Sequence, residues 1–222
     1  MSFNIAIDGP AGAGKSTIAK RVAKELGFIY VDTGAMYRTI ALYLLTNQVD
    51  CEQEEQLAAA LDNIEISIAY ENGEQQMLLN GENVTGRIRT EEVGQMASRS
   101  SAKPIVRAKL LALQRSMAAS SDVLMDGRDI GTMILPDAQL KIYLTASTAA
   151  RAKRRYLELQ EKGETCSLEE IEKDMEERDY RDMHRETAPL RQAEDAVLVD
   201  SSDMTIQQVV ERIKALAAER RA

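Results

Sequence analysis

Short apolar runs recur along the chain and are separated by segments with helical spacing. Runs of this kind are typical of strands that are buried in a parallel sheet. In one intervening segment Met36, Ile40 and Leu44 fall on one face, as in an amphipathic helix. Strands that alternate with helices predict an α/β protein with a parallel sheet and right-handed crossovers. The five predicted core strands are 3–7, 28–32, 122–126, 141–144 and 196–200.

The pattern changes between residues 64 and 84. Ile64, Ile66 and Ile68 alternate with other residues, which predicts a half-buried strand. A polar turn at 71–74 and a short run at 76–80 complete a hairpin, with room for a third short strand at Val84. Antiparallel hairpins are foreign to an alternating β-α sheet, so we interpret this region as an insert.

The other segments with helical spacing include two with recognisable first turns. Pro104 lies near the start of one, and Ser167 precedes Glu169 and Glu170 in the other, as an N-cap does. The predicted helices are 18–26, 35–45, 50–60, 90–100, 103–119, 147–160, 167–185 and 205–222.

The segment IDGPAGAGKST contains the pattern G-x-x-x-x-G-K-[ST] between a predicted strand and a predicted helix. Its glycines allow a tight loop whose backbone N–H groups point at a polyphosphate. The positive end of the helix, the Lys15 ammonium and the Ser16 hydroxyl add contacts for the outer phosphates and for magnesium. The segment therefore predicts a nucleoside triphosphate site rather than a chance glycine-rich turn.

Composition narrows the choice of partners. The formal net charge of −8 disfavours a nucleic acid or an anionic membrane. Cys51 and Cys166 are far apart, and the single histidine argues against a structural zinc site. We see neither a signal peptide nor an apolar run near the ~20 residues that span a bilayer. A reduced, cytoplasmic protein is expected.

Polar residues follow the predicted strands, where the ligand edge of a parallel sheet lies. Asp126 is the last residue of its predicted strand, which is the position of a carboxylate that helps to hold magnesium. It could also cap a turn. No glutamate follows it, which weighs against an ATPase motor. Arg38 and Arg128 fall near this edge and are plausible phosphate clamps through bidentate contacts.

Two further arginine clusters stand out in this acidic chain. Arg178, Arg181 and Arg185 have spacings that would place them on one helical face. The alternative is a solvated helix whose arginines pair with Asp174 and Glu177. Arg151, Arg154 and Arg155 form a second cluster of the same kind. Together they suggest a mobile cover that neutralises charge during phosphoryl transfer.

The chain offers no obvious general base, and we assign no role to His184. A kinase whose acceptor is a hydroxyl needs a base. A phosphate monoester does not, because its second pKa is about 6 and it is already anionic at pH 7. Abundant arginine and the missing base therefore favour a kinase of nucleoside monophosphates.

Motifs along nearly the whole chain support this interpretation. They are IDGPAGAGKST, VDTGAMYR, TGRIRTEEV, DGRDIGT, PDAQLKIYL, ERDYRD and APL, in that order. With them the chain resembles the bacterial cytidylate kinases, members of the nucleoside monophosphate kinase family. The resemblance implies a P-loop kinase of one domain, 1–222, with a monophosphate-binding insert at 35–100 and a lid at 150–190. It also implies ATP and CMP or dCMP as substrates, Mg²⁺ as cofactor and, we expect, a monomer.

The resemblance also implies roles for individual residues. The ATP loop would be Gly9, Pro10, Ala11, Gly12, Ala13, Gly14, Lys15, Ser16 and Thr17, with Ser16 on the magnesium ion and Asp126 acting indirectly. The acceptor phosphate would contact Thr33, Arg38 and Arg128, where Thr33 replaces the serine of many relatives. Ser98, Arg107 and Asp129 would read cytosine, Arg178 and Asp182 would face the ribose, and Arg185 would reach the phosphate region. The catalytic set would be Lys15, Arg128, Arg151, Arg181 and Arg185.

Two alternatives stay open at this stage. A UMP/CMP kinase or another small-molecule kinase would share the loop and the arginines. A P-loop GTPase switch would need an Asn-Lys-x-Asp type of guanine reader after a late strand. The nearest string, Asn47 to Asp50, follows a predicted helix early in the chain, which weighs against a GTPase.

Overall fold

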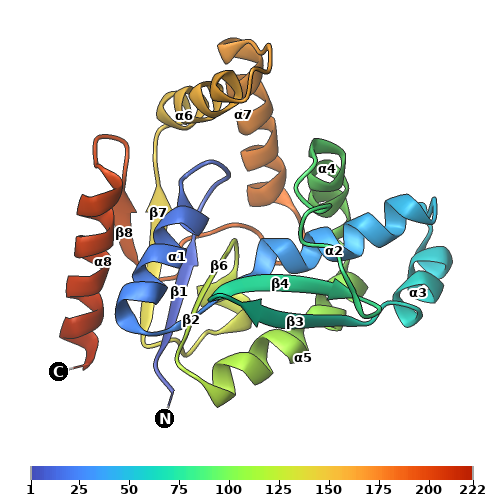
Figure 1. Cartoon of the computed structure of the whole chain (residues 1–222), viewed down its shortest axis with the longest axis horizontal. Coiled ribbons are helices and arrows are strands. Elements are labelled where there is room, and N and C mark those ends of the chain that lie inside the picture. Colours follow the sequence, from blue (N-terminus) through green and yellow to red (C-terminus); the bar gives the residue numbers. More distant parts are fainter. Residues whose placement is uncertain (1, 222) are drawn as a thin grey trace. The chain divides into compact units, whose positions relative to one another are not determined.

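Five strands form the main sheet in the order β2-β6-β1-β7-β8. β1 pairs in parallel with β6 and β7, and β8 pairs in parallel with β7. The predicted five-stranded α/β sheet is therefore confirmed (Figure 1). The strands are β1 (Asn4–Asp8), β2 (Ile29–Asp32), β6 (Val123–Gly127), β7 (Leu140–Thr145) and β8 (Val197–Asp200).

The computed structural model describes residues 2–221 and divides into two compact units. The first unit comprises the chain up to Tyr30 and from Ala118 onward. The second unit is Val31–Met117 and includes the expected insert 35–100. Within 2–221, no helix is both long enough and apolar enough for a membrane span.

The core of the first unit follows from the apolar runs. Ile5 and Ile7 of β1 and Ile142 of β7 are almost completely buried, and they pack with helices α1 and α8. Each helix contributes one apolar stripe to this cluster, as expected for an amphipathic helix on a sheet. The helices are α1 (Lys15–Leu26), α6 (Thr148–Glu161), α7 (Leu168–His184) and α8 (Ile206–Arg221).

One element of the first unit lies outside the sequence prediction. Residues Ile130–Ile134 form a π-helical turn, η1, directly after the segment Arg128–Asp129. Its first backbone amides donate to the side chain of Asp8 in β1. The local sequence does not reveal this contact.

The second unit contains the predicted hairpin. β3 and β4 are antiparallel, and β5 extends them at Glu82–Asn83, one position before the expected Val84. The turn between β3 and β4 uses Asn72 and Gly73 with φ of 53° and 79°, the left-handed pair that a tight hairpin prefers. The remaining elements are α2 (Thr33–Thr46), α3 (Glu54–Asp62), β3 (Ile66–Glu71), β4 (Glu74–Leu79), α4 (Glu91–Ser100) and α5 (Pro104–Ser120).

Candidate active site

The glycine-rich loop joins β1 to α1 in the first unit. Gly9 has a φ of 151°, and a Cβ on it would lie 1.9 Å from the Leu144 carbonyl oxygen, so only glycine fits there. Gly14 is the left-handed N-cap of α1, with a φ of 80°. The positive N-terminal end of α1 therefore faces the loop, as phosphate binding requires.

Lys15 opens α1 and is almost fully buried, with 6% of its surface exposed. Its Nζ donates a hydrogen bond of 2.6 Å to the Pro10 carbonyl oxygen. Burial, followed by the nearby guanidinium of Arg128, lowers the pKa of Lys15 well below its usual value. Negative charge from a bound polyphosphate would oppose both effects and favour the ammonium form.

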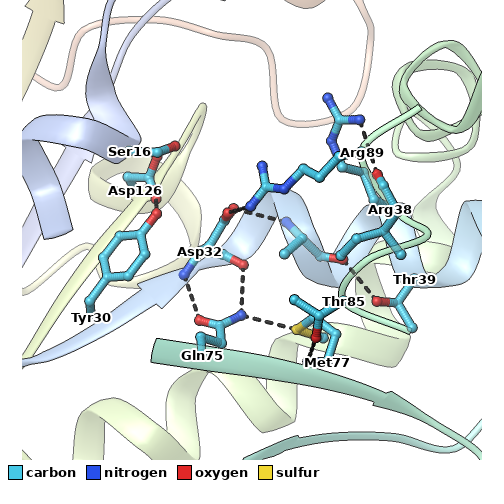
Figure 2. A network of polar contacts seen from close by, with 12 residues as sticks. Ser16, Tyr30, Asp32, Arg38, Thr39, Gln75, Met77, Thr85, Arg89 and Asp126 are labelled. Carbon is cyan, nitrogen blue, oxygen red and sulfur yellow. Dashed lines mark hydrogen bonds and ion pairs between the residues drawn. The ribbon is translucent and has the colours of Figure 1, made fainter. Parts of the chain in front are cut away.

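The predicted magnesium residues lie together. Ser16 Oγ donates to Asp126 Oδ2 at 2.9 Å, and the Tyr30 hydroxyl donates to Asp126 Oδ1 at 2.8 Å (Figure 2). A hydroxyl and a carboxylate are hard oxygen donors, which is the chemistry Mg²⁺ prefers. This pair fits an ion that takes its other ligands from phosphates and water. Tyr30 was not predicted, although a buried tyrosine generally needs such a partner.

Arg151 is buried against the phosphate loop and does not belong to an exposed arginine cluster. Its Nη1 donates to the Ala11 carbonyl oxygen at 2.7 Å, and its Nη2 lies 2.7 Å from Asp179 Oδ2. The Ala11 amide in turn donates to Asp179 Oδ1 at 3.3 Å. Met175 of α7 also approaches the loop, because a Cβ on Gly12 would lie 3.0 Å from its Cε. A side chain from α6 thus bonds the carbonyl of Ala11, and one from α7 bonds its amide.

The other arginines of α6 are engaged elsewhere. Arg154 donates to the Ser201 carbonyl oxygen, and Arg155 forms an exposed pair with Glu158 at 3.3 Å. The expectation that Arg151, Arg154 and Arg155 form one cluster is therefore wrong. Helical spacing gives the face of a residue, but it does not give the partners that each long side chain reaches.

Arg128 and Asp182 form a mostly buried ion pair, with Arg128 Nε 2.9 Å from Asp182 Oδ2. Burial by itself would lower the pKa of Arg128 and raise that of Asp182. Their mutual attraction, together with the charges of neighbouring residues, outweighs burial, so the pKa of Arg128 is raised and that of Asp182 is lowered. Both groups are held in their charged forms.

A second pair joins Asp129 to Arg185. Arg185 Nη2 lies 3.6 Å from Asp129 Oδ1, and Asp129 is only 3% exposed. The Arg185 guanidinium also donates to the Ala188 carbonyl oxygen, from Nε at 2.9 Å and from Nη2 at 2.6 Å. Ala188 has a φ of 48°, so the APL motif uses a strained residue to present this carbonyl.

The expected single face of Arg178, Arg181 and Arg185 is not observed. α7 ends at His184, and Arg185 has extended backbone, with φ −65° and ψ 141°. Arg181 Nη1 lies 4.0 Å from Glu177, and the Arg181 side chain is 55% exposed, which matches the alternative of a solvated pair. Arg178 lies one turn before Asp182, and its charge helps to lower the pKa of Asp182. The catalytic role of Arg181 stays a prediction.

In the second unit, Thr33 and Arg38 lie near the start of α2. Asp32 caps this helix by accepting from the Ala35 amide at 2.9 Å, and Thr33 is 2% exposed. Arg38 Nη1 donates to the Ile88 carbonyl oxygen at 3.3 Å (Figure 2). A Cβ on Gly94 would lie 3.1 Å from the same Nη1, so a glycine in α4 leaves room for this guanidinium.

Ser98 and Arg107, the predicted base readers of the second unit, both contact Ser101 at the end of α4. The Arg107 guanidinium lies over the ring of Tyr37, 5.4 Å from its centre. It also donates to the Ser101 carbonyl oxygen at 3.2 Å. Ser101 Oγ donates to the Ser98 carbonyl oxygen at 3.2 Å, which places all four residues in one group.

The hairpin is tied to the start of α2 by residues that the sequence analysis left without a role. Gln75 of β4 accepts from the Asp32 amide at 2.8 Å and donates to its carbonyl oxygen at 3.3 Å (Figure 2). Arg89 forms an ion pair with Asp32 Oδ2. The motif TGRIRTEEV contains Arg89, and that motif was the one available signal for its importance.

The predicted acceptor residues are thus divided between the two units. Arg128, Asp129, Arg178, Asp182 and Arg185 belong to the first unit, and Thr33, Arg38, Ser98 and Arg107 belong to the second. Their assigned roles stay predictions.

Comparisons with known proteins identify the family. The family model for cytidylate kinase matches residues 5–219. A cytidylate kinase from Lactobacillus johnsonii is 50% identical over 211 residues, which cover 95% of this chain and 92% of that protein. One from Streptococcus pneumoniae is 50% identical over 220 residues, 99% of each chain. A solved structure of an uncharacterized protein from Eubacterium ventriosum has a TM-score of 0.52 at 11% identity, covers 98% of this chain and 99% of that one, and supports the fold alone. The chain belongs to the cytidylate kinase family.

Proposed function

We propose that this chain transfers the γ-phosphoryl group of ATP to CMP, and also to dCMP, to give ADP and CDP or dCDP. The observation that carries the proposal is the match to the cytidylate kinase family along 5–219. The reaction is a direct in-line transfer, in which positioning and charge stabilisation supply the catalysis.

On the donor side, the loop amides and the N-terminus of α1 bind the phosphates of ATP, and Lys15 reaches the group that is transferred. Ser16, with Asp126 behind it, would hold Mg²⁺. The ion would neutralise charge on the β- and γ-phosphates. Tyr30 fixes the Asp126 carboxylate by its hydrogen bond of 2.8 Å.

On the acceptor side, arginines bind the phosphate, and no general base is needed. The CMP phosphate is already anionic, so it needs charge neutralisation and alignment rather than deprotonation. Arg38 and Arg128 bind this phosphate together with Thr33. Arg151, Arg181 and Arg185 add positive charge as the γ-phosphoryl group moves.

Base choice falls to Asp129, Arg107 and Ser98, and ribose contacts fall to Arg178 and Asp182. Asp129 accepts from the cytosine amino group, and Arg107 donates to the ring acceptors. We further expect a monomer that acts in the cytoplasm, in agreement with its two free thiols, Cys51 and Cys166.

The test is a coupled ADP-release assay with ATP–Mg²⁺ and a panel of CMP, dCMP, UMP, AMP and GMP. We expect the highest kcat/KM with CMP and dCMP, and little ADP without an acceptor. Lys15→Ala, purified in parallel, should lose this activity and so exclude a contaminating kinase. Equal turnover of UMP would favour a UMP/CMP kinase, and acceptor-independent GTP hydrolysis would favour a GTPase; either result overturns the proposal.

A further inference from the structure

Asp8 is a buried acid to which the proposed reaction gives no role. It is the last residue of β1, directly before the phosphate loop, and is 5% exposed. Its Oδ1 accepts from the Ile130 amide at 2.8 Å, and its Oδ2 accepts from the Gly131 amide at 2.7 Å. Within residues 2–221 neither oxygen takes part in an ion pair, so the carboxylate is held by backbone amides.

These two amides open the turn η1. The first N–H groups of a helical turn have no partner inside the turn, so they need an acceptor from elsewhere. Asp129 precedes η1, but its side chain makes no capping bond. Asp8 supplies the cap from another strand and binds two successive amides with its two oxygens.

The contact between Asp8 and η1 is close on both sides. A Cβ on Gly131 would lie 3.4 Å from Asp8 Oδ2 and 3.1 Å from Lys141 Cδ. On the other side of Asp8, Gly9 is pressed against the Leu144 carbonyl oxygen. Asp8 therefore connects the phosphate loop to η1 at a point where both are closely packed.

We propose that Asp8 is a positioning residue, which fixes the segment Arg128–Asp129 against the phosphate loop and so aligns phosphate binding and base reading with the donor site. The inference rests on the proposed function, in which Arg128 and Asp129 contact the acceptor. Sub-ångström placement of such groups is worth large factors in rate.

The cost of the buried charge supports a role beyond folding. Burial raises the pKa of Asp8 to about 7, although both amide bonds act in the opposite direction. A neutral cap residue would hold one amide without this cost. A carboxylate accepts from two amides at once, with both oxygens in one plane. This fixes the orientation of η1 as well as its distance from β1.

The experiment compares three variants with the wild type. Asp8→Asn keeps the shape but turns an NH₂ group toward one of the two amides. Gly131→Ala leaves Asp8 intact and pushes on the same contact from η1. Asp122→Asn is the matched control, because Asp122 Oδ1 accepts from the Phe3 amide at 2.7 Å, beside the opposite end of β1.

For Asp8→Asn we expect kcat/KM for CMP to fall about tenfold or more and the CMP:UMP ratio of kcat/KM to shrink. The Kd for ATP, measured by direct binding, should stay within about twofold. Gly131→Ala should shift the ratio in the same direction, and it carries the test alone if Asp8→Asn does not fold. Asp122→Asn should leave the ratio unchanged. An unchanged ratio in both site variants, or equal losses for ATP and CMP, overturns the proposal.

Amide exchange in the nucleotide-free protein separates this inference from the proposed function. The Ile130 and Gly131 amides should exchange faster in Asp8→Asn and at the wild-type rate in Asp122→Asn. A wild type that does not phosphorylate CMP would defeat the proposed function, and the exchange rates would still report whether Asp8 holds η1. An active wild type whose exchange at both amides is unchanged in Asp8→Asn would defeat the positioning role alone.

Discussion

Ser16 Oγ donates to Asp126 Oδ2 at 2.9 Å, and this bond links the end of the phosphate loop to the end of β6. The two residues are far apart in sequence, but parallel strands bring their carboxyl ends to the same edge of the sheet. A hydrogen bond from a hydroxyl to an anionic oxygen is charge-assisted, so it fixes the orientation of the Ser16 hydroxyl. In the proposed reaction, this orientation places Ser16 for magnesium.

Asp126→Asn tests this arrangement. The variant keeps the volume but removes the negative charge behind Ser16, so we expect kcat/KM to fall about 10- to 100-fold. The Mg²⁺ concentration for half-maximal rate should rise. Tyr30→Phe removes only the hydroxyl that donates to Asp126 Oδ1 and should cost less than Asp126→Asn. Equal Mg²⁺ dependence in wild type and Asp126→Asn would contradict the assignment.

Lys15→Ala should act mainly on kcat. The Lys15 ammonium stabilises charge that develops on the transferred group, so its loss costs more in the transition state than in the ground state. We expect kcat to fall about 100-fold or more and the KM for ATP to change by only a few-fold. Lys24→Ala, at the exposed far end of α1, is the control and should leave kcat and the KM for ATP unchanged. An unchanged kcat in Lys15→Ala would remove Lys15 from the mechanism.

The parts that sequence predicted well are those that local chemistry determines. The phosphate loop, the five core strands and the hairpin each depend on residues within one short segment. The Ser167 cap follows the same rule, since its hydroxyl accepts from an amide three residues ahead. These features could be predicted because their partners are neighbours in the sequence.

What sequence left open depends on contacts between distant segments. η1 forms where Asp8, from β1, bonds the Ile130 and Gly131 amides. Arg151 is buried because it reaches Ala11 on another segment. Helical spacing could not distinguish this arginine from an exposed one, since spacing describes a helix by itself. Arg89 and Gln75 likewise contact Asp32 from segments that are distant in the sequence.

Asp8 should leave a signature in the pH dependence of stability. Its pKa is about 7 in the folded protein and near the usual 3.8 when unfolded, so the folded state binds more protons between these values. Stability therefore falls as pH rises from about 4 to 7. Between pH 5 and 7 the loss amounts to about 2 kcal/mol, because one pKa unit corresponds to about 1.4 kcal/mol and the folded carboxyl is already half ionised at pH 7.

Urea unfolding at pH 5, 6, 7 and 8 of wild type and Asp8→Asn measures this effect. The variant should lack this part of the slope, so its free energy of unfolding should fall less with pH. Both proteins contain the groups that shift the pKa of Asp8, among them Asp129 and Lys15. Both also contain Lys141, which lies beside Gly131. The difference between the curves thus reports the titration of Asp8 together with its effect on Lys15. Parallel curves would show that Asp8 has an ordinary pKa.

The segment 150–190 should respond to substrates. Chemistry next to water risks hydrolysis of ATP, so we expect this segment to close fully only when both nucleotides are bound. Arg151 and Asp179 already contact the Ala11 peptide, which gives the segment a direct link to the phosphate loop. Hydrogen exchange in 150–190 should slow with ATP and an unreactive CMP analogue together. Equal protection with and without nucleotides would exclude a closing lid.

The choice of base should depend on Asp129. Cytosine presents an amino donor at N4 beside an acceptor at N3, and uracil reverses both groups. A carboxylate at Asp129 and a guanidinium at Arg107 satisfy CMP, whereas UMP would set a carbonyl against the carboxylate and an N–H against the guanidinium. Asp129 is buried and pairs with Arg185 at 3.6 Å, so solvent is a poor substitute for the lost contact. One such contact is worth about 1–3 kcal/mol of discrimination, or roughly 5- to 150-fold.

Asp129→Asn keeps the shape of the side chain but can turn an amide N–H toward the O4 of uracil. We therefore expect kcat/KM for CMP to fall and the CMP:UMP ratio to shrink, with kcat/KM measured for both substrates. Asp137→Asn, an exposed acid after η1, is the control and should leave both values unchanged. If Asp129 served only to hold the turn after β6, CMP and UMP would lose activity alike and the ratio would stay constant. In that case Ser98 and Arg107 would have to carry the selectivity.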